Sequence, residues 1–261
     1  MRVATWNVNS VGARLPRLLD WLATAAPDVV CLQETKCADD AFPQAEVAEL
    51  GYAAAVHGSG RWNGVAVLSR LGLADVEPGF AGAPGFPAGT PPEARAITAT
   101  CGPLRVTSVY VPNGRTPEDP HYAYKLAWLA ALTGAVGIDV TGERPYVVCG
   151  DFNVAPTDDD VFDPAAFVGS THVTGPERAA LVALGRTGLH DVLPRPLKYD
   201  RPFTYWDYRA GAFHKNLGMR IDLVLADDAA RTAVRDAYVD REARKGSSPS
   251  DHAPVVVDLQ W

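Results

Sequence analysis

The chain alternates short apolar runs with amphipathic helical patterns along its length, and this order strongly limits the folds open to it. Eight runs have the length of strands and are bounded by Gly, Pro, Asp or Asn: residues 3–6, 29–32, 65–68, 97–100, 106–111, 146–149, 221–225 and 255–259. Helical spacing of apolar residues occurs between them, at 14–25, 123–136 and 178–185. Interleaved strands and helices predict an α/β fold.

Polar side chains at the ends of these runs indicate the strand directions. One set follows its runs and lies at carboxyl ends: Glu34, Asp151 and Asn153. The other set opens or precedes its runs and lies at amino ends: Asp222, Asp251 and His252. If both sets form one site, their strands run in opposite directions, which excludes a purely parallel barrel or Rossmann sheet. We therefore expect mixed sheets covered by helices.

A length of 261 residues allows one large domain or two small ones. The Pro/Gly-rich stretches at 78–92, 111–120 and 195–202 are typical of long surface loops, because apolar strands resume directly after them. We expect a single domain over residues 1–261.

The cysteines and the amino terminus favour a cytoplasmic protein. The four cysteines form no C-x-x-C pair, so neither a zinc knuckle nor a disulfide framework is indicated. Polar residues occur by Thr5, and no run of ~18 apolar residues follows, so we expect no signal peptide and no contact with a membrane.

Three acidic clusters indicate a metal site, namely 33–35 (QET), 150–153 (GDFN) and 250–252 (SDH). Each alone is more often a turn or a helix cap. Together, carboxylates on turns at strand ends can hold a hard cation such as Mg²⁺, and Mn²⁺ is also hard enough for such a site. With neutral amides and a histidine nearby, the set suits metal-assisted hydrolysis of phosphoesters.

Seven motifs in this chain resemble those of the exonuclease III family of apurinic/apyrimidinic endonucleases, within the endonuclease/exonuclease/phosphatase superfamily. They are TWNVNS at 5–10, LQETK at 32–36, YVPNG at 110–114, GDFNVAPTD at 150–158, TYWDYR at 204–209, RIDLVLA at 220–226 and SDHAPV at 250–255. GDxN and SDH are shared by the wider superfamily, whereas LQETK, WDYR and RID are more specific. The resemblance implies a four-layered α/β sandwich, in which two mixed β-sheets pack face to face with helices outside.

The resemblance also implies how metal and water are held. Glu34 would be the principal metal ligand, with Asn7 and Asp251 close to the ion. Asp151 would activate the attacking water or protonate the leaving oxygen, and the sequence leaves both roles open. Asn153 would orient the water or Asp151.

On the phosphate side, the resemblance implies that His252 binds and polarises the scissile phosphate, paired with Asp222. This pairing makes independent sense, because a carboxylate fixes the imidazole tautomer and favours its protonated form. Tyr110 and Asn113 match phosphate-contacting positions of the family, and Tyr110 is assigned to the catalytic set.

A lesion pocket is implied at Tyr205, Met219 and Ile221, where a flipped-out sugar without its base would fit. Common family members carry Trp or Phe where this chain has Tyr205, which leaves lesion preference open. Trp206 is a further candidate for DNA contact, although an aromatic residue in a strand more often packs in a core.

The acidic balance, a net charge of −7 and a pI near 5.3, excludes a broadly basic, coat-like DNA binder. Between 195 and 220, however, six Lys or Arg stand against two Asp, as a rim that tracks phosphates would require. Arg209 in this stretch and Arg95 outside it are assigned to DNA binding.

Two further groups of residues are interpreted as structural. The three aspartates at 158–160 suit the start of a helix. The remaining histidines lack acidic motifs and are interpreted as surface or core residues: His57, His121, His172, His190 and His214.

The favoured function is a Mg²⁺-dependent DNA-repair hydrolase. It would cleave duplex DNA 5′ to abasic sites and act as 3′-phosphodiesterase or phosphatase and 3′-to-5′ exonuclease, as a monomer. The balance among these activities depends on loop shapes. Alternatives are a small-molecule or lipid phosphodiesterase or phosphatase of the same superfamily, which would not need the basic 195–220 segment, and a non-enzymatic relative, which would have lost one of the acids or the histidine.

Overall fold

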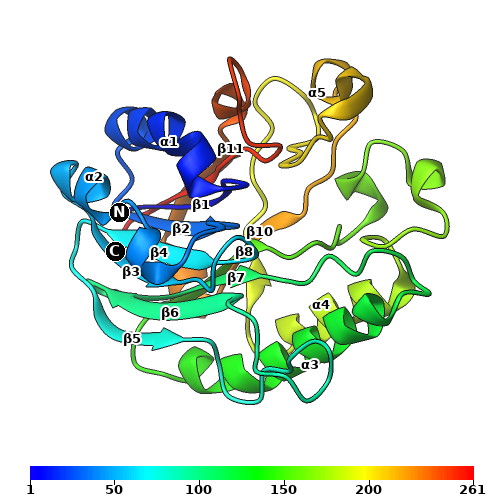
Figure 1. The fold of residues 1–261 in the computed structure, drawn as a ribbon, viewed down its shortest axis with the longest axis horizontal. Coiled ribbons are helices and arrows are strands. Elements are labelled where there is room, and N and C mark those ends of the chain that lie inside the picture. The colour runs from blue at the N-terminus through cyan, green and yellow to red at the C-terminus, as the bar shows by residue number, and fades with distance from the viewer.

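The computed structural model describes residues 1–261, the side chain of Ile138 excepted, and contains two six-stranded β-sheets (Figure 1). The strands of the first sheet are β1 (Arg2–Asn7), β2 (Val29–Gln33), β3 (Ala53–His57), β4 (Val65–Ser69), β11 (Val234–Val239) and β12 (Val255–Leu259). Those of the second are β5 (Ala74–Pro78), β6 (Ala96–Cys101), β7 (Leu104–Tyr110), β8 (Tyr146–Asp151), β9 (His190–Asp191) and β10 (Asp222–Ala226).

Both sheets are mixed, as the polar strand ends predict. Their orders are β11-β12-β1-β2-β4-β3 and β5-β6-β7-β8-β10-β9. In each sheet one central pair is parallel, β1 with β2 and β7 with β8, and the other pairs are antiparallel. Because β10 runs against β8 and β12 runs against β1, carboxyl ends and amino ends meet at one edge of the sandwich.

The α-helices are α1 (Val11–Ala25), α2 (Gln44–Glu49), α3 (Pro120–Val140), α4 (Gly175–Gly185), α5 (Ala212–Lys215) and α6 (Asp228–Ala233). The predicted helices correspond to α1, α3 and α4, and each begins three residues earlier than its apolar pattern. Their first turns are set by capping side chains, those of Ser10, Asp119 and Thr174, rather than by apolar residues. Among the described residues, no helix combines the length and apolar character needed to cross a membrane.

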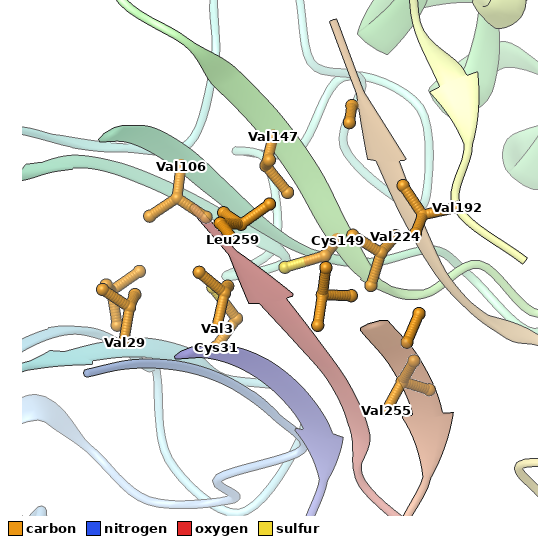
Figure 2. Packing of buried hydrophobic residues seen from close by; sticks show 14 of the residues in the cluster. Val3, Val29, Cys31, Val106, Val147, Cys149, Val192, Val224, Val255 and Leu259 are labelled. Atoms are coloured by element: carbon orange, nitrogen blue, oxygen red, sulfur yellow. The ribbon is translucent and has the colours of Figure 1, made fainter. Parts of the chain in front are cut away.

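Three apolar clusters separate four layers, and this confirms the expected sandwich. The inner faces of the two sheets form one cluster, and Figure 2 shows Val3, Cys31 and Val255 of the first sheet and Val106, Val147 and Cys149 of the second filling the same interior. The outer face of the first sheet packs against α1 and α2, and that of the second against α3 and α4 (Figure 1).

The four strands that the sequence did not predict are the four edge strands: β3, β5, β9 and β11. Each has one unpaired side, and β5 is exposed along its whole length. Edge strands tolerate charged and small residues, so they lack the apolar runs of central strands.

Candidate active site

Inward-facing positions of the central strands change from apolar to polar toward one edge of the sandwich. Successive inward side chains are Val3, Thr5 and Asn7 in β1; Val106, Ser108 and Tyr110 in β7; and Val147, Cys149 and Asp151 in β8. The candidate site therefore lies where the inter-sheet core ends.

A buried amide separates this site from the core. Gln33 donates from Nε2 to Ser108 Oγ of the opposite sheet (3.0 Å) and to Thr5 Oγ1 (2.9 Å). These polar groups are buried and hydrogen-bonded, as an interior layer requires. They form a fixed base for the side chains above them.

Strand register brings the reacting groups side by side. Asp151 in β8 pairs with Tyr110 of β7 on one side and with Asp222 of β10 on the other. Gly150, with φ +151°, permits the close approach of β7, because a Cβ there would lie 1.9 Å from the carbonyl oxygen of Val109.

Asn7 joins the two main carboxylates. Its Nδ2 donates to Glu34 Oε1 (2.8 Å) and to Asp151 Oδ2 (2.9 Å), while its Oδ1 accepts the N–H of Asn9 (3.0 Å). The amide therefore presents a donor, not a ligand oxygen, to the site. In this orientation Asn7 holds both carboxylates in place, and its contact with Glu34 leaves it close to the expected position of the ion.

Glu34 is held by its backbone and by Lys36. Its φ of +53° places it in the left-handed region, a strain of about 1–3 kcal/mol that functional sites can retain. Burial by itself raises the pKa of Glu34, but Lys36, whose Nζ lies 2.7 Å from Oε2, and the hydrogen bond from Asn7 lower the pKa below its usual value. The carboxylate is ionised at neutral pH.

His252 lies between two aspartates. Its Nδ1 is 2.8 Å from Asp222 Oδ2, and its Nε2 is 3.8 Å from Asp151 Oδ2. Burial lowers the pKa of His252, yet Asp222 and Asp151 overcome this and raise it to about 10. Burial also raises the pKa of Asp151, which the charge of His252 counteracts and Asp222 and Glu34 reinforce, to about 7.

The ligand atoms of Glu34, Asp151 and His252 lie within 4.8 Å of one another. The two carboxylates are hard oxygen donors, whereas His252 is protonated at neutral pH and offers no lone pair. The donor set therefore fits a hard divalent cation bound through oxygen. Asp251 is adjacent, but its Oδ1 accepts from Asn9 Nδ2 (3.0 Å).

Two further amides meet here: Asn113, expected to contact the phosphate, and Asn153, expected to orient the water or Asp151. Asn113 donates from Nδ2 to Asn153 Oδ1 (3.2 Å), and the Asn153 backbone N–H donates to Asp151 Oδ1 (2.9 Å). Tyr110 is partly buried beside Glu34, and desolvation and this carboxylate raise its pKa, so its hydroxyl stays a donor.

His172 belongs to this edge of the site, which corrects its interpretation as an unrelated surface or core residue. Its Nδ1 lies 2.5 Å from the carbonyl oxygen of Asn153, and its Nε2 lies 3.5 Å from Asn113 Nδ2. Burial and the nearby Lys125 lower the pKa of His172 to about 4, so it is neutral at neutral pH. No motif in the sequence marked it.

The three residues expected to form a lesion pocket do meet. Met219 and Ile221 form a small apolar cluster with Ala155 and Val161, and Tyr205 packs against it. The ring of Tyr205 is 4.9 Å from that of His252. Met219 and Ile221 are buried (6% and 2% exposed), so of these three residues only Tyr205 presents a partly exposed surface beside the imidazolium.

Two residues assigned to DNA binding are buried, and the structure corrects both assignments. Trp206 is 1% exposed, packs in the inter-sheet cluster and donates from Nε1 to Asn216 Oδ1. Arg95 is 5% exposed, pairs with Glu93 (2.7 Å) and lies over the Tyr110 ring, so it supports Tyr110.

Only some of the basic residues at 195–220 are exposed. Arg220 is 2% exposed and pairs with Asp160 (2.6 Å) and Asp191 (2.8 Å). Arg209 is exposed, and Asp207 neutralises its charge at 2.5 Å. A count of basic residues therefore overstates the free positive charge. Asp160 caps a short 3₁₀ helix with Thr157, which matches the structural interpretation of 158–160.

Hard oxygen ligands beside an imidazolium and neutral amides suit attack of water on a phosphate ester, so fold and site define a phosphoester hydrolase. Comparison with known proteins narrows this class. The pattern of the Endonuclease/Exonuclease/phosphatase family matches residues 4–252.

Solved structures of nucleases and of a 3′ phosphatase are also similar to this chain. The 3′-5′ exonuclease NExo of Neisseria meningitidis is 39% identical with a TM-score of 0.93, and the 3′ phosphatase NExo bound to a product DNA hairpin is 38% identical with a TM-score of 0.94. An AP endonuclease of Archaeoglobus fulgidus is 34% identical with a TM-score of 0.92. Each comparison covers 100% of both chains.

An exodeoxyribonuclease of Bacillus subtilis is 28% identical over 98% of this chain and 98% of its own length. The chain belongs to the endonuclease/exonuclease/phosphatase family, in its exonuclease III/AP endonuclease branch, and is a hydrolytic nuclease.

Proposed function

We propose that this protein is a DNA-repair hydrolase. It cleaves duplex DNA 5′ to abasic sites and removes 3′-blocking groups and 3′-terminal nucleotides by in-line attack of water. The observation that carries the proposal is the continuous contact from Asp222 through His252 and Asp151 to Asn7 and Glu34. The activities in the names of NExo, the Archaeoglobus AP endonuclease and the Bacillus exodeoxyribonuclease support it.

Mg²⁺, or Mn²⁺ in its place, is the cofactor that we propose. Glu34 would hold it, with Asp251 adjacent, and Lys36 and Asn7 keep Glu34 ionised and oriented. When bound, such a cation neutralises charge that develops on the phosphate oxygens.

Asp151 handles the proton. Its pKa of about 7 lets it take a proton from water or give one to the leaving oxygen near neutral pH, and either role suits this geometry. Asn153 orients Asp151, because its backbone N–H donates to Asp151 Oδ1.

His252 binds the scissile phosphate as an imidazolium. Asp222 accepts from Nδ1 and leaves the Nε2 proton free to donate toward the site. Tyr110 and Asn113 add neutral donors beside it, and such fixed donors stabilise charge on phosphate oxygens.

The substrate pocket that we propose has the ring of Tyr205 as its apolar wall, with the buried Met219 and Ile221 packed behind it. A flipped-out sugar without its base would rest against this ring. We further propose that residues 1–261 act as one domain and as a monomer, and that the free cysteines suit a reducing compartment such as the cytoplasm.

Three duplexes test this proposal: one with an abasic analogue, one with a 3′-phosphate and one intact, each with Mg²⁺ and with EDTA. We expect metal-dependent cleavage of the abasic duplex 5′ to the analogue, phosphate release from the second and slower shortening of the third. If the protein instead releases phosphate from small-molecule esters and leaves all three duplexes intact, it is a small-molecule phosphatase.

A further inference from the structure

A buried ion pair lies behind the phosphate side of the site. Lys125 of α3 and Glu177 of α4 contact each other through Nζ and Oε1, and both side chains are 0% exposed. Exchanging a buried ion pair for apolar residues is often neutral or stabilising. Stability therefore gives little reason for this pair to be present.

The ammonium of Lys125 is directed at the loops that carry the amides. Its Nζ donates to the carbonyl oxygen of Asn153 (2.6 Å) and to that of Asn113 (3.1 Å). It also lies 3.3 Å from Thr171 Oγ1. A single charged group thus fixes the backbone of both residues whose side chains line the phosphate side.

Glu177 completes the connection on the opposite side of Lys125. Its Oε1 accepts from Thr171 Oγ1 (2.6 Å) and from the backbone N–H of His172 (2.9 Å). Its Oε2 accepts from the backbone N–H and the hydroxyl of Thr174 (3.0 and 2.8 Å), which caps α4. The carboxylate therefore links the loop of His172 to the first turn of α4.

Packing around the pair leaves little freedom. Gly114, with φ +91°, follows Asn113, and a Cβ there would lie 2.8 Å from Thr171 Oγ1 and 3.0 Å from Lys125 Cδ. The loop after β7 therefore lies directly on the lysine stem. A shift of Lys125 would move Asn113 and Asn153 together.

We propose that Lys125 and Glu177 are positioning residues that set the places of Asn113 and Asn153 for phosphate binding and water orientation. This inference rests on the proposed function. The pair touches neither substrate nor metal and acts through two backbone carbonyls. Displacement of a catalytic group by about 1 Å can cost about a hundredfold in rate.

The test is the double variant Lys125→Met/Glu177→Gln, which removes both charges and leaves no buried charge unpaired. On the 3′-phosphate duplex we expect kcat to fall about 10–100-fold. KM should change less than kcat, because the positioned amides act mainly on the charge that develops in the transition state. The Mg²⁺ concentration for half-maximal rate should stay the same, because the metal ligands are untouched.

The matched control is Arg105→Met, which removes a largely buried arginine and its ion pairs with the more exposed Glu77 and Asp139 at the opposite end of β7. It should lower Tm and leave kcat unchanged. A folded double variant, judged by circular dichroism at the assay temperature, that keeps kcat within about threefold of wild type overturns the inference.

If the double variant does not fold, the variant Thr171→Val tests the inference in its place. It removes the hydroxyl between Lys125, Glu177 and the Asn113 carbonyl oxygen, with little change in volume. A fall in kcat of about 3–10-fold supports the inference, and an unchanged kcat overturns it. Wild-type protein is assayed in parallel: if it cleaves no duplex, the proposed function fails and the inference fails with it.

Discussion

Replacing Asp151 with asparagine is expected to slow release of phosphate from a 3′-phosphate duplex by at least about a hundredfold, because loss of a general acid or base costs about 10²–10⁴ in rate. Asparagine keeps the shape of the side chain and can still accept from the Asn153 N–H. It cannot exchange a proton near neutral pH. Single-turnover kinetics with Mg²⁺ measure the chemical step directly.

Stability is the control for this variant. Because the pKa of Asp151 in the fold is about 7, above its ordinary value of 3.8, the folded state binds more protons than the unfolded state between these values. Ionisation of Asp151 therefore costs stability as pH rises through this window, and the cost is fully present above it. In metal-free buffer above neutral pH, Asp151→Asn should melt no lower than wild type. A variant with near-wild-type turnover would contradict the assignment of Asp151.

His252→Ala is expected to reduce the same rate by at least about a hundredfold, since it removes a charged donor aimed at the phosphate. Asp222→Asn keeps the imidazole ring of His252 but removes the carboxylate that favours its protonated form. It therefore serves as the matched variant. In wild type the pKa of His252 is about 10, so the imidazolium persists through neutral pH and is lost only near that value. Rate profiles from about pH 6 to about pH 10 measure this.

We expect the alkaline fall in rate to move to lower pH in Asp222→Asn, because the main partner that raises the pKa of His252 has become neutral. The direction follows from linkage, since a weaker partner lets the proton leave earlier. Identical profiles in the two proteins would show that the charge of His252 does not act in the reaction.

One physical reason explains why the sequence predicted both the central strands and the edge of the sandwich where the site lies. Central strands such as β2 and β8 are buried on both faces, so they are continuous apolar runs that end abruptly at polar residues. Edge strands such as β5 lack that constraint, and their residues give no comparable signal.

The main error was to expect single charged or aromatic residues on the surface where the structure buries them. Arg95, Trp206 and Arg220 have the composition of a DNA-binding surface, yet all three are buried. Their partners include Tyr110, Asn216 and Asp160, which lie ten or more residues away along the chain. Local composition carries no information about such partners. Burial has to be known before a charge can be assigned to a surface.

Lys125 and Glu177 were missed although each leaves a trace in the sequence. Lys125 is a lone charge inside the apolar helical pattern at 123–136, and Glu177 is the fourth residue of a T-x-x-E capping box. Both patterns are common in helices without any ion pair. Only the fold places the two residues together behind Asn113 and Asn153.

The central claim is that a divalent cation at Glu34 enables hydrolysis of a DNA phosphoester, and a Mg²⁺ titration of EDTA-treated protein on the 3′-phosphate duplex tests it most directly. We predict no phosphate release without the metal, full recovery when it is added, and a requirement for at least about tenfold more Mg²⁺ in Glu34→Gln. Phosphate release that persists in EDTA, or a Glu34→Gln titration that coincides with wild type, would contradict the claim.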